Sequence, residues 1–128
     1  MPRARFSGIH IPVVTPFRGG AFDADTMAAL IDRLIAAGVE CLHPLQALAR
    51  GMEADALARD FRGRIAFMGG IDTQQLLVHG SPDDVRADVR RVKRLLGPCL
   101  IVSPSHEALL PNVPPENVRA MAEEAAAV

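Results

Sequence analysis

Four short apolar runs, each followed by a stretch with helical periodicity, constrain the fold of this chain more than any other feature. The runs cover residues 8–14, 39–45, 64–71 and 99–103. Strands that are apolar throughout and alternate with helices are typical of a parallel sheet covered by helices. A complete barrel of eight such units usually needs about 250 residues, whereas this chain has 128. The sequence predicts an α/β fold of four consecutive βα units, either a small open sheet or half of a (β/α)8 TIM-type barrel.

The stretches between the runs carry signals for the ends of helices. Asp23 is a suitable N-cap for a helix over about 25–37, and Ser81 followed by Pro82 begins a helix that ends at Gly97. Two more helices are expected, one near 52–61 and one from about residue 115 onward. The apolar faces are predicted to consist of Met27, Leu30, Ile31, Leu34 and Ile35, then Val85, Val89, Val92 and Leu96, and lastly Val118, Met121, Ala122 and Ala125.

Composition argues against several classes of partner. The net charge is −1 and the sequence pI is about 6.4, which favours neither nucleic acid nor an anionic membrane surface. No apolar run approaches the roughly 18 residues that a membrane helix needs, and the basic start of the chain is not followed by the apolar core of a signal peptide. We expect a single cytoplasmic domain over residues 1–128, with Cys41 and Cys99 as buried thiols.

Polar residues follow three of the predicted strands at the end where parallel α/β folds place their sites. They are His43 and Gln46, then Asp72 and Thr73, and then Ser105 and His106. Gly70 lies just before the second pair and permits close approach of a ligand to the backbone. For Asp72 the alternative is a cap on the following segment, and for Gly70 it is a tight turn.

Most of the chain resembles the C-terminal part of the uroporphyrinogen decarboxylase family. The motifs GGIDTQ, HGSPDDV, SPSH and VPPENV occur in that family's order and spacing, over about residues 37–128. The resemblance implies a (β/α)8 barrel and C–C lyase chemistry on a tetrapyrrole, without a metal or another cofactor. It also matches His106 to a pocket histidine, so we expect His106 to be catalytic, because imidazole exchanges protons near neutral pH. The substrate-binding candidates are His43, Gln46, Gly70, Asp72, Thr73 and Ser105.

The first part of the chain, about residues 6–39, resembles the N-terminus of the dihydrodipicolinate synthase and N-acetylneuraminate lyase family. The resemblance rests on the VTPF turn and on a helix that ends in Gly38-Val39, so a junction between the two families is expected there. That family forms a Schiff base through a lysine at a strand end. The single lysine here, Lys93, lies in a helical run of arginines, where we expect a solvated side chain, and the chain has no tyrosine. Aldolase activity is therefore disfavoured.

Zinc-dependent methyltransferases related to the decarboxylase suggest one further alternative. The pair Cys41 and His43 shares one strand face and Cys–His sets suit zinc, but Cys99 and His106 belong to opposite ends of their strand. We therefore expect no metal.

The two resemblances also leave the completeness of the site open. The aspartate and arginines that hold the tetrapyrrole in the decarboxylase family belong to the half of the barrel that this chain lacks. We expect the chain to be incomplete as a catalyst by itself and to form homo-oligomers, because a half-barrel exposes sheet edges. Two alternatives stay open: a non-enzymatic remnant or interaction domain, and a homodimer whose halves close one barrel around a tetrapyrrole or a small carboxylated substrate.

Overall fold

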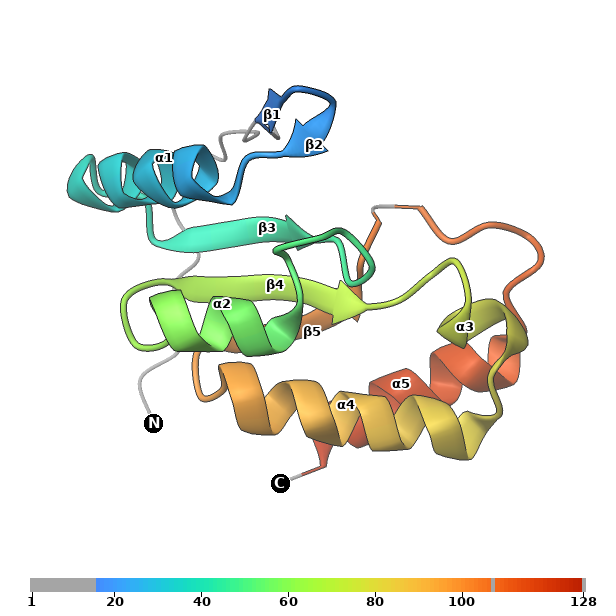
Figure 1. Cartoon of the computed structure of the whole chain (residues 1–128). Helices are drawn as coiled ribbons and strands as arrows, with labels where there is room; N and C mark the ends of the chain where they lie inside the picture. The colour runs from blue at the N-terminus through green and yellow to red at the C-terminus, as the bar shows by residue number, and fades with distance from the viewer. Residues whose placement is uncertain (1–15, 107, 128) are drawn as a thin grey trace.

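A three-stranded parallel sheet forms the centre of the protein (Figure 1). The computed structural model describes residues 16–106 and 108–127. The strands are β3 (Cys41–Leu45), β4 (Ala66–Ile71) and β5 (Leu100–Pro104), in the order β3-β4-β5. The register of β4 and β5 is continuous from Phe67 opposite Leu100 to Ile71 opposite Pro104, whereas the β3–β4 register shifts between Leu42 and Leu45. The predicted α/β class with a parallel sheet is thus confirmed for three strands.

The first predicted βα unit is not confirmed, since its strand, residues 8–14, lies outside the described residues. The sequence beyond it forms a small antiparallel hairpin of β1 (Phe17–Arg18) and β2 (Ala21–Phe22), which we did not predict. Gly19 and Gly20 form its turn with φ values of 59° and 78°, a region in which glycine alone is unstrained.

The helices follow the predicted end signals closely. They are α1 (Ala24–Ala36), α2 (Ala54–Phe61), α3 (Leu76–His79), α4 (Pro82–Leu96) and α5 (Pro115–Ala126). The Asp23 carboxylate accepts a hydrogen bond from the backbone N–H of Thr26, and Ser81 with Asp84 forms a reciprocal capping box at the start of α4. The short helix α3 was not predicted, because its four residues are too few to show a periodicity.

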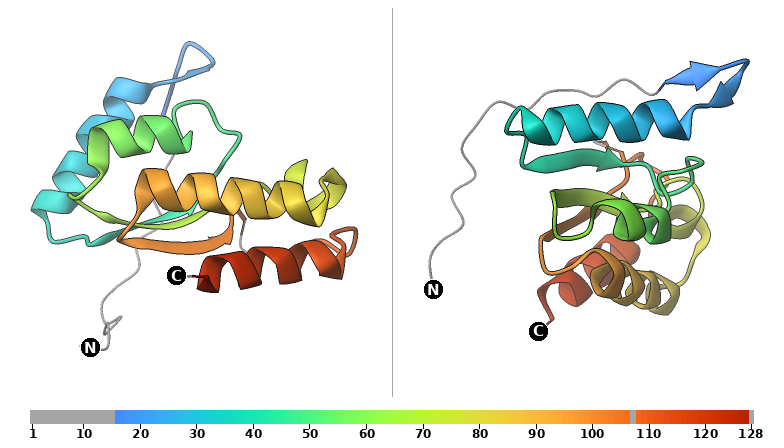
Figure 2. Two further views of the ribbon diagram at one scale, coloured as in Figure 1. Left: turned by 90° about the horizontal axis from the view of Figure 1, so that it is seen from below. Right: turned by 60° about the vertical axis from the view of Figure 1, so that its left-hand side comes forward.

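The core lies between the sheet and the helices α2 and α4, which run along one face of the sheet (Figure 2). The predicted face of α4 is confirmed, since Val85, Val89, Val92 and Leu96 are all fully buried. The predicted face of α5 is wrong in part: Met121 is buried, but Ala122 is exposed, and Asn117 and Ala120 are buried beside Met121. The face that packs on α4 is therefore displaced around the helix.

Lys93 and Cys99 differ from their predicted surroundings. Lys93 is half-buried, and its Nζ donates to the carbonyl oxygens of Glu124 (3.0 Å), Ala125 (3.3 Å) and Ala127 (2.6 Å). The expectation of a solvated lysine is wrong, because α5 ends beside α4 and its last carbonyls need donors. Cys99 is exposed, because it precedes β5 rather than lying in it, whereas Cys41 is half-buried and burial raises the pKa of its thiol.

No helix in the described part of the chain combines the length and the apolarity that crossing a membrane requires.

Candidate functional site

The carboxyl ends of the three parallel strands bring polar side chains from distant parts of the sequence together. Gln46 follows β3, Thr73 follows β4, and Ser105 and His106 follow β5. Strands that run in the same direction end at the same edge of a sheet, so residues just beyond neighbouring strands are neighbours in space. A hydrogen bond between Gln46 and His106, which are 60 positions apart in the sequence, confirms this convergence.

The His106 imidazole is held at both ring nitrogens. Its Nδ1 lies 2.7 Å from the Thr73 hydroxyl, and its Nε2 lies 2.9 Å from the Gln46 amide nitrogen. His106 itself is exposed, whereas Thr73 is only 9% exposed and Gln46 is half-buried. The ring is thus presented to solvent by partners that are themselves fixed in the protein.

Ser105 also belongs to this hydrogen-bond network. It is fully buried, and its hydroxyl lies 3.4 Å from the Thr73 hydroxyl and 3.5 Å from His106 Nδ1. Its backbone N–H donates to the carbonyl oxygen of Ile71 at 2.7 Å, which continues the β4–β5 pairing beyond the last strand residue. Ser105 therefore fixes the backbone that carries His106.

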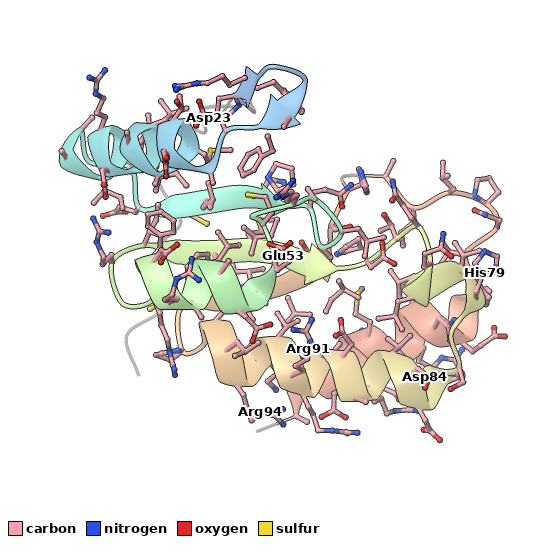
Figure 3. The ribbon with its side chains drawn as sticks, viewed as in Figure 1. Asp23, Glu53, His79, Asp84, Arg91 and Arg94 are labelled. Carbon is pink, nitrogen blue, oxygen red and sulfur yellow. The ribbon has the colours of Figure 1, made fainter. Side chains whose placement is uncertain are left out.

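The loop after β3 positions Gln46 through its own hydrogen bonds. The backbone carbonyl oxygen of Gln46 accepts from Ala49 N (3.0 Å), and the carboxylate of Glu53, which is labelled in Figure 3, accepts from Gly51 N (2.7 Å). Glu53 is the N-cap residue of α2, and sequence reasoning missed its role in this loop. The Oε1 atom of Gln46 is buried and has no hydrogen-bond partner among the described residues.

The Asp72 carboxylate is used by the backbone that follows it. One oxygen accepts from Gln74 N (2.9 Å), and the other accepts from Gln75 N and Leu76 N (2.8 Å each). Asp72 is only 5% exposed, and these three bonds fix the turn into α3. The geometry corresponds to the capping alternative, and a ligand would have to compete with backbone donors for this group.

Two other predicted residues lie on the sheet itself. Gly70 has a φ of 92°, and a Cβ atom there would lie 3.2 Å from Val92 Cγ1, so backbone conformation and helix packing both favour glycine. His43 Nδ1 lies 3.3 Å from the carbonyl oxygen of Met68 in β4. No hydrogen bond within the described residues joins His43 or Asp72 to His106, and a cleft shared by all three stays a prediction.

Two cavities lie at the opposite, amino-terminal end of the sheet. One, of about 420 Å³, is lined by residues 38–40 and 63–66 and by Cys99. The other, of about 210 Å³, is lined by Lys93, Pro98 and neighbouring residues. Lys93 is therefore placed away from the strand ends where an aldolase lysine would be needed.

Residues with metal-binding side chains do not gather in the described ranges. Between residues 16 and 127, with Glu107 left aside, no three His, Cys, Asp or Glu side chains are close enough to hold an ion. Cys41, His43, Cys99 and His106 in particular form no such group.

One comparison with known proteins gives a match. The model of the family Uroporphyrinogen decarboxylase (URO-D) matches residues 14–128. No curated protein and no solved structure matches the chain. The family match runs across the junction expected near Gly38, and nothing supports the resemblance of residues 6–39 to the synthase and lyase family.

Proposed function

Because the chain belongs to the uroporphyrinogen decarboxylase family, we propose that it carries part of a metal-independent decarboxylase site. Its ligand is a carboxylated tetrapyrrole or a similar small carboxylated molecule. The observation that carries the proposal is the His106 imidazole, exposed at the carboxyl ends of the strands and held by Thr73 and Gln46.

His106 is proposed to transfer the proton that the reaction requires. Decarboxylation of a pyrrole substituent releases CO₂ and leaves the electron pair of the broken C–C bond on the remaining molecule, where a proton replaces the carboxylate. Protonation of the pyrrole beforehand makes this electron pair easier to accommodate. An imidazole suits such steps, because both of its protonation states are accessible near neutral pH.

The charges of the described loops support a site that is incomplete in this chain. A tetrapyrrole with several carboxylates needs several cations. The loop after β3 offers Arg50, which is exposed, and the β1–β2 hairpin offers Arg18, which already pairs with Asp23 at 2.9 Å. We therefore expect weak binding by this chain alone, with further cations supplied by another part of the assembly.

The open edges of the sheet suggest that a second copy of the chain supplies these further cations. Among the described strands of the parallel sheet, β3 and β5 each pair with one neighbour only. Open edges promote association through the backbone, and we expect dimers or larger species at micromolar concentration. Sedimentation that shows a monomer across this range would contradict the proposed assembly.

Titration with an octacarboxylated porphyrin, followed by fluorescence, tests the proposed binding. We expect weak binding that is lost in His106→Ala and kept in His79→Ala, because His79 lies on α3 at the protein surface. Equal affinity of the wild type and His106→Ala would show that the site has been misplaced.

A further inference from the structure

The two nitrogens of the His106 ring have chemically different partners. Nε2 lies 2.9 Å from the Gln46 Nε2 amide group, which carries two hydrogens and no lone pair for accepting a hydrogen bond. Histidine Nε2 must therefore accept. In a neutral ring the proton is then on Nδ1, and Nδ1–H donates to the Thr73 hydroxyl oxygen at 2.7 Å. The arrangement thus selects one of the two neutral tautomers.

Both partners can also serve the charged ring. A threonine hydroxyl donates or accepts, and a glutamine amide offers a donor at one atom and an acceptor at the other. The imidazolium donates from both nitrogens, so it needs an oxygen opposite Nε2. A half-turn of the Gln46 amide supplies Oε1 there. The rotation breaks no bond of Oε1, which has no hydrogen-bond partner among the described residues, but it moves the amide N–H groups to that buried position. This desolvation cost keeps the amide in its present orientation while the ring is neutral.

In the described part of the site, no carboxylate forms a hydrogen bond with the His106 ring. The carboxylate of Asp72, the residue before Thr73, receives three backbone N–H groups through its two oxygens. The described hydrogen-bond partners of the ring are the side chains of Gln46, Thr73 and Ser105, which are all neutral. The ring is thus oriented by groups that tolerate both of its protonation states.

We infer that Gln46 and Thr73 are positioning residues that hold His106 as the Nδ1–H tautomer and make Nε2 the nitrogen that takes up a proton. When Nε2 gains a proton from solvent, Nδ1–H stays on Thr73, the ring becomes cationic, and the Gln46 amide turns so that Oε1 accepts the new N–H until this proton passes to the ligand. The transfer to the ligand rests on the proposed function, whereas the tautomer is a property of the protein without ligand.

The tautomer can be measured by NMR on the full chain labelled with ¹⁵N-histidine, at alkaline pH where imidazoles are neutral. We expect the His106 signals to show a protonated Nδ1 and an unprotonated Nε2. Gln46→Met keeps the side-chain length without the amide and should give a mixture of tautomers. Thr73→Val should have a similar effect, and Thr73→Ser, which keeps the hydroxyl, should restore the wild-type pattern.

The other histidines act as internal references. His79 is exposed on α3, and its signals should not change in any variant. A protonated Nε2 in the wild type would overturn the inference, and so would His106 signals that are unchanged in Gln46→Met. Because Gln46 is only half-buried, this variant decides the question even if Thr73→Val does not fold.

The porphyrin titration separates this inference from the proposed function. If the protein shows the expected tautomer but binds no porphyrin, the positioning role of Gln46 and Thr73 is supported and the proposed ligand is contradicted. If porphyrin binding depends on His106 but the ring is the Nε2–H tautomer, the proposed ligand is supported and the positioning role of Gln46 and Thr73 is overturned.

Discussion

Replacement of Asn117 by alanine should cost about 2 kcal/mol of unfolding free energy, although Asn117 lies in a helix and alanine is the better helix former. Asn117 is 1% exposed on α5, and its Nδ2 donates to the carbonyl oxygens of Leu77 (3.1 Å) and Gly80 (2.8 Å). These two bonds tie α5 to α3 and to the turn that precedes α4.

The magnitude follows from the two bonds. Each contributes about 0.5–1.5 kcal/mol, so their loss costs about 1–3 kcal/mol, and two buried carbonyl oxygens lose this donor. Removal of the buried Oδ1, which has no hydrogen-bond partner among the described residues, offsets part of the cost. Asn117→Asp should be more harmful than Asn117→Ala, because it places carboxylate oxygens against carbonyl oxygens in a buried site.

Urea unfolding of the three proteins, extrapolated to water, measures the differences. Asn112→Ala is the matched control, since Asn112 is exposed in the β5–α5 loop, and its effect should stay within about 0.5 kcal/mol. If Asn117→Ala were as stable as this control, or if Asn117→Asp were as stable as the wild type, the anchoring role would be refuted.

Three further predictions concern single positions. Gly69→Ala should cost at least about 2 kcal/mol in urea unfolding, because the residue has a φ of 124° and its new Cβ would lie 2.7 Å from Leu45 N; a smaller loss would contradict the tight approach of β3 and β4. Hydrogen bonds from Ser81 hold the pKa of the Asp84 carboxyl below its ordinary value of 3.8, so this stabilisation is complete above that pH and lost as the pH falls through the lowered pKa. The acid-induced fall in Tm should therefore be smaller in Asp84→Asn, and an identical pH profile would refute the contribution. Borohydride with pyruvate should trap no adduct, because Lys93 donates to two carbonyls of α5 and to that of Ala127 just beyond it; mass spectrometry that finds an adduct at Lys93 would contradict this placement.

Local signals in the sequence account for much of the fold. The spacing of Val85, Val89 and Val92 gave the buried face of α4, and Ser81 and Asp23 gave the starts of two helices, because capping and helical periodicity depend on residues close in the chain. The β1–β2 hairpin and α3 were missed, since two-residue strands and a four-residue helix carry no periodicity.

Features that depend on distant contacts were harder to predict. The residues of the His106 network could be predicted as neighbours, because the carboxyl ends of parallel strands converge. The individual hydrogen bonds among these residues could not be predicted, and neither could the burial of Asn117 against α3. For Asp72 the local sequence suggested both a cap and a ligand contact, and the structure shows the cap. Such details depend on how the loops and helices pack, which no local pattern of residues specifies.

The central claim is that the carboxyl ends of the strands form the ligand site, and mapping of porphyrin binding on the backbone amides by NMR tests it most directly. We predict that an octacarboxylated porphyrin shifts the amide signals of Gln46, Thr73 and His106 and leaves those of Glu40 and Arg64 unchanged. Glu40 and Arg64 line the cavity of about 420 Å³ at the amino-terminal end of the sheet. Shifts confined to Glu40, Arg64 and their neighbours would contradict the account.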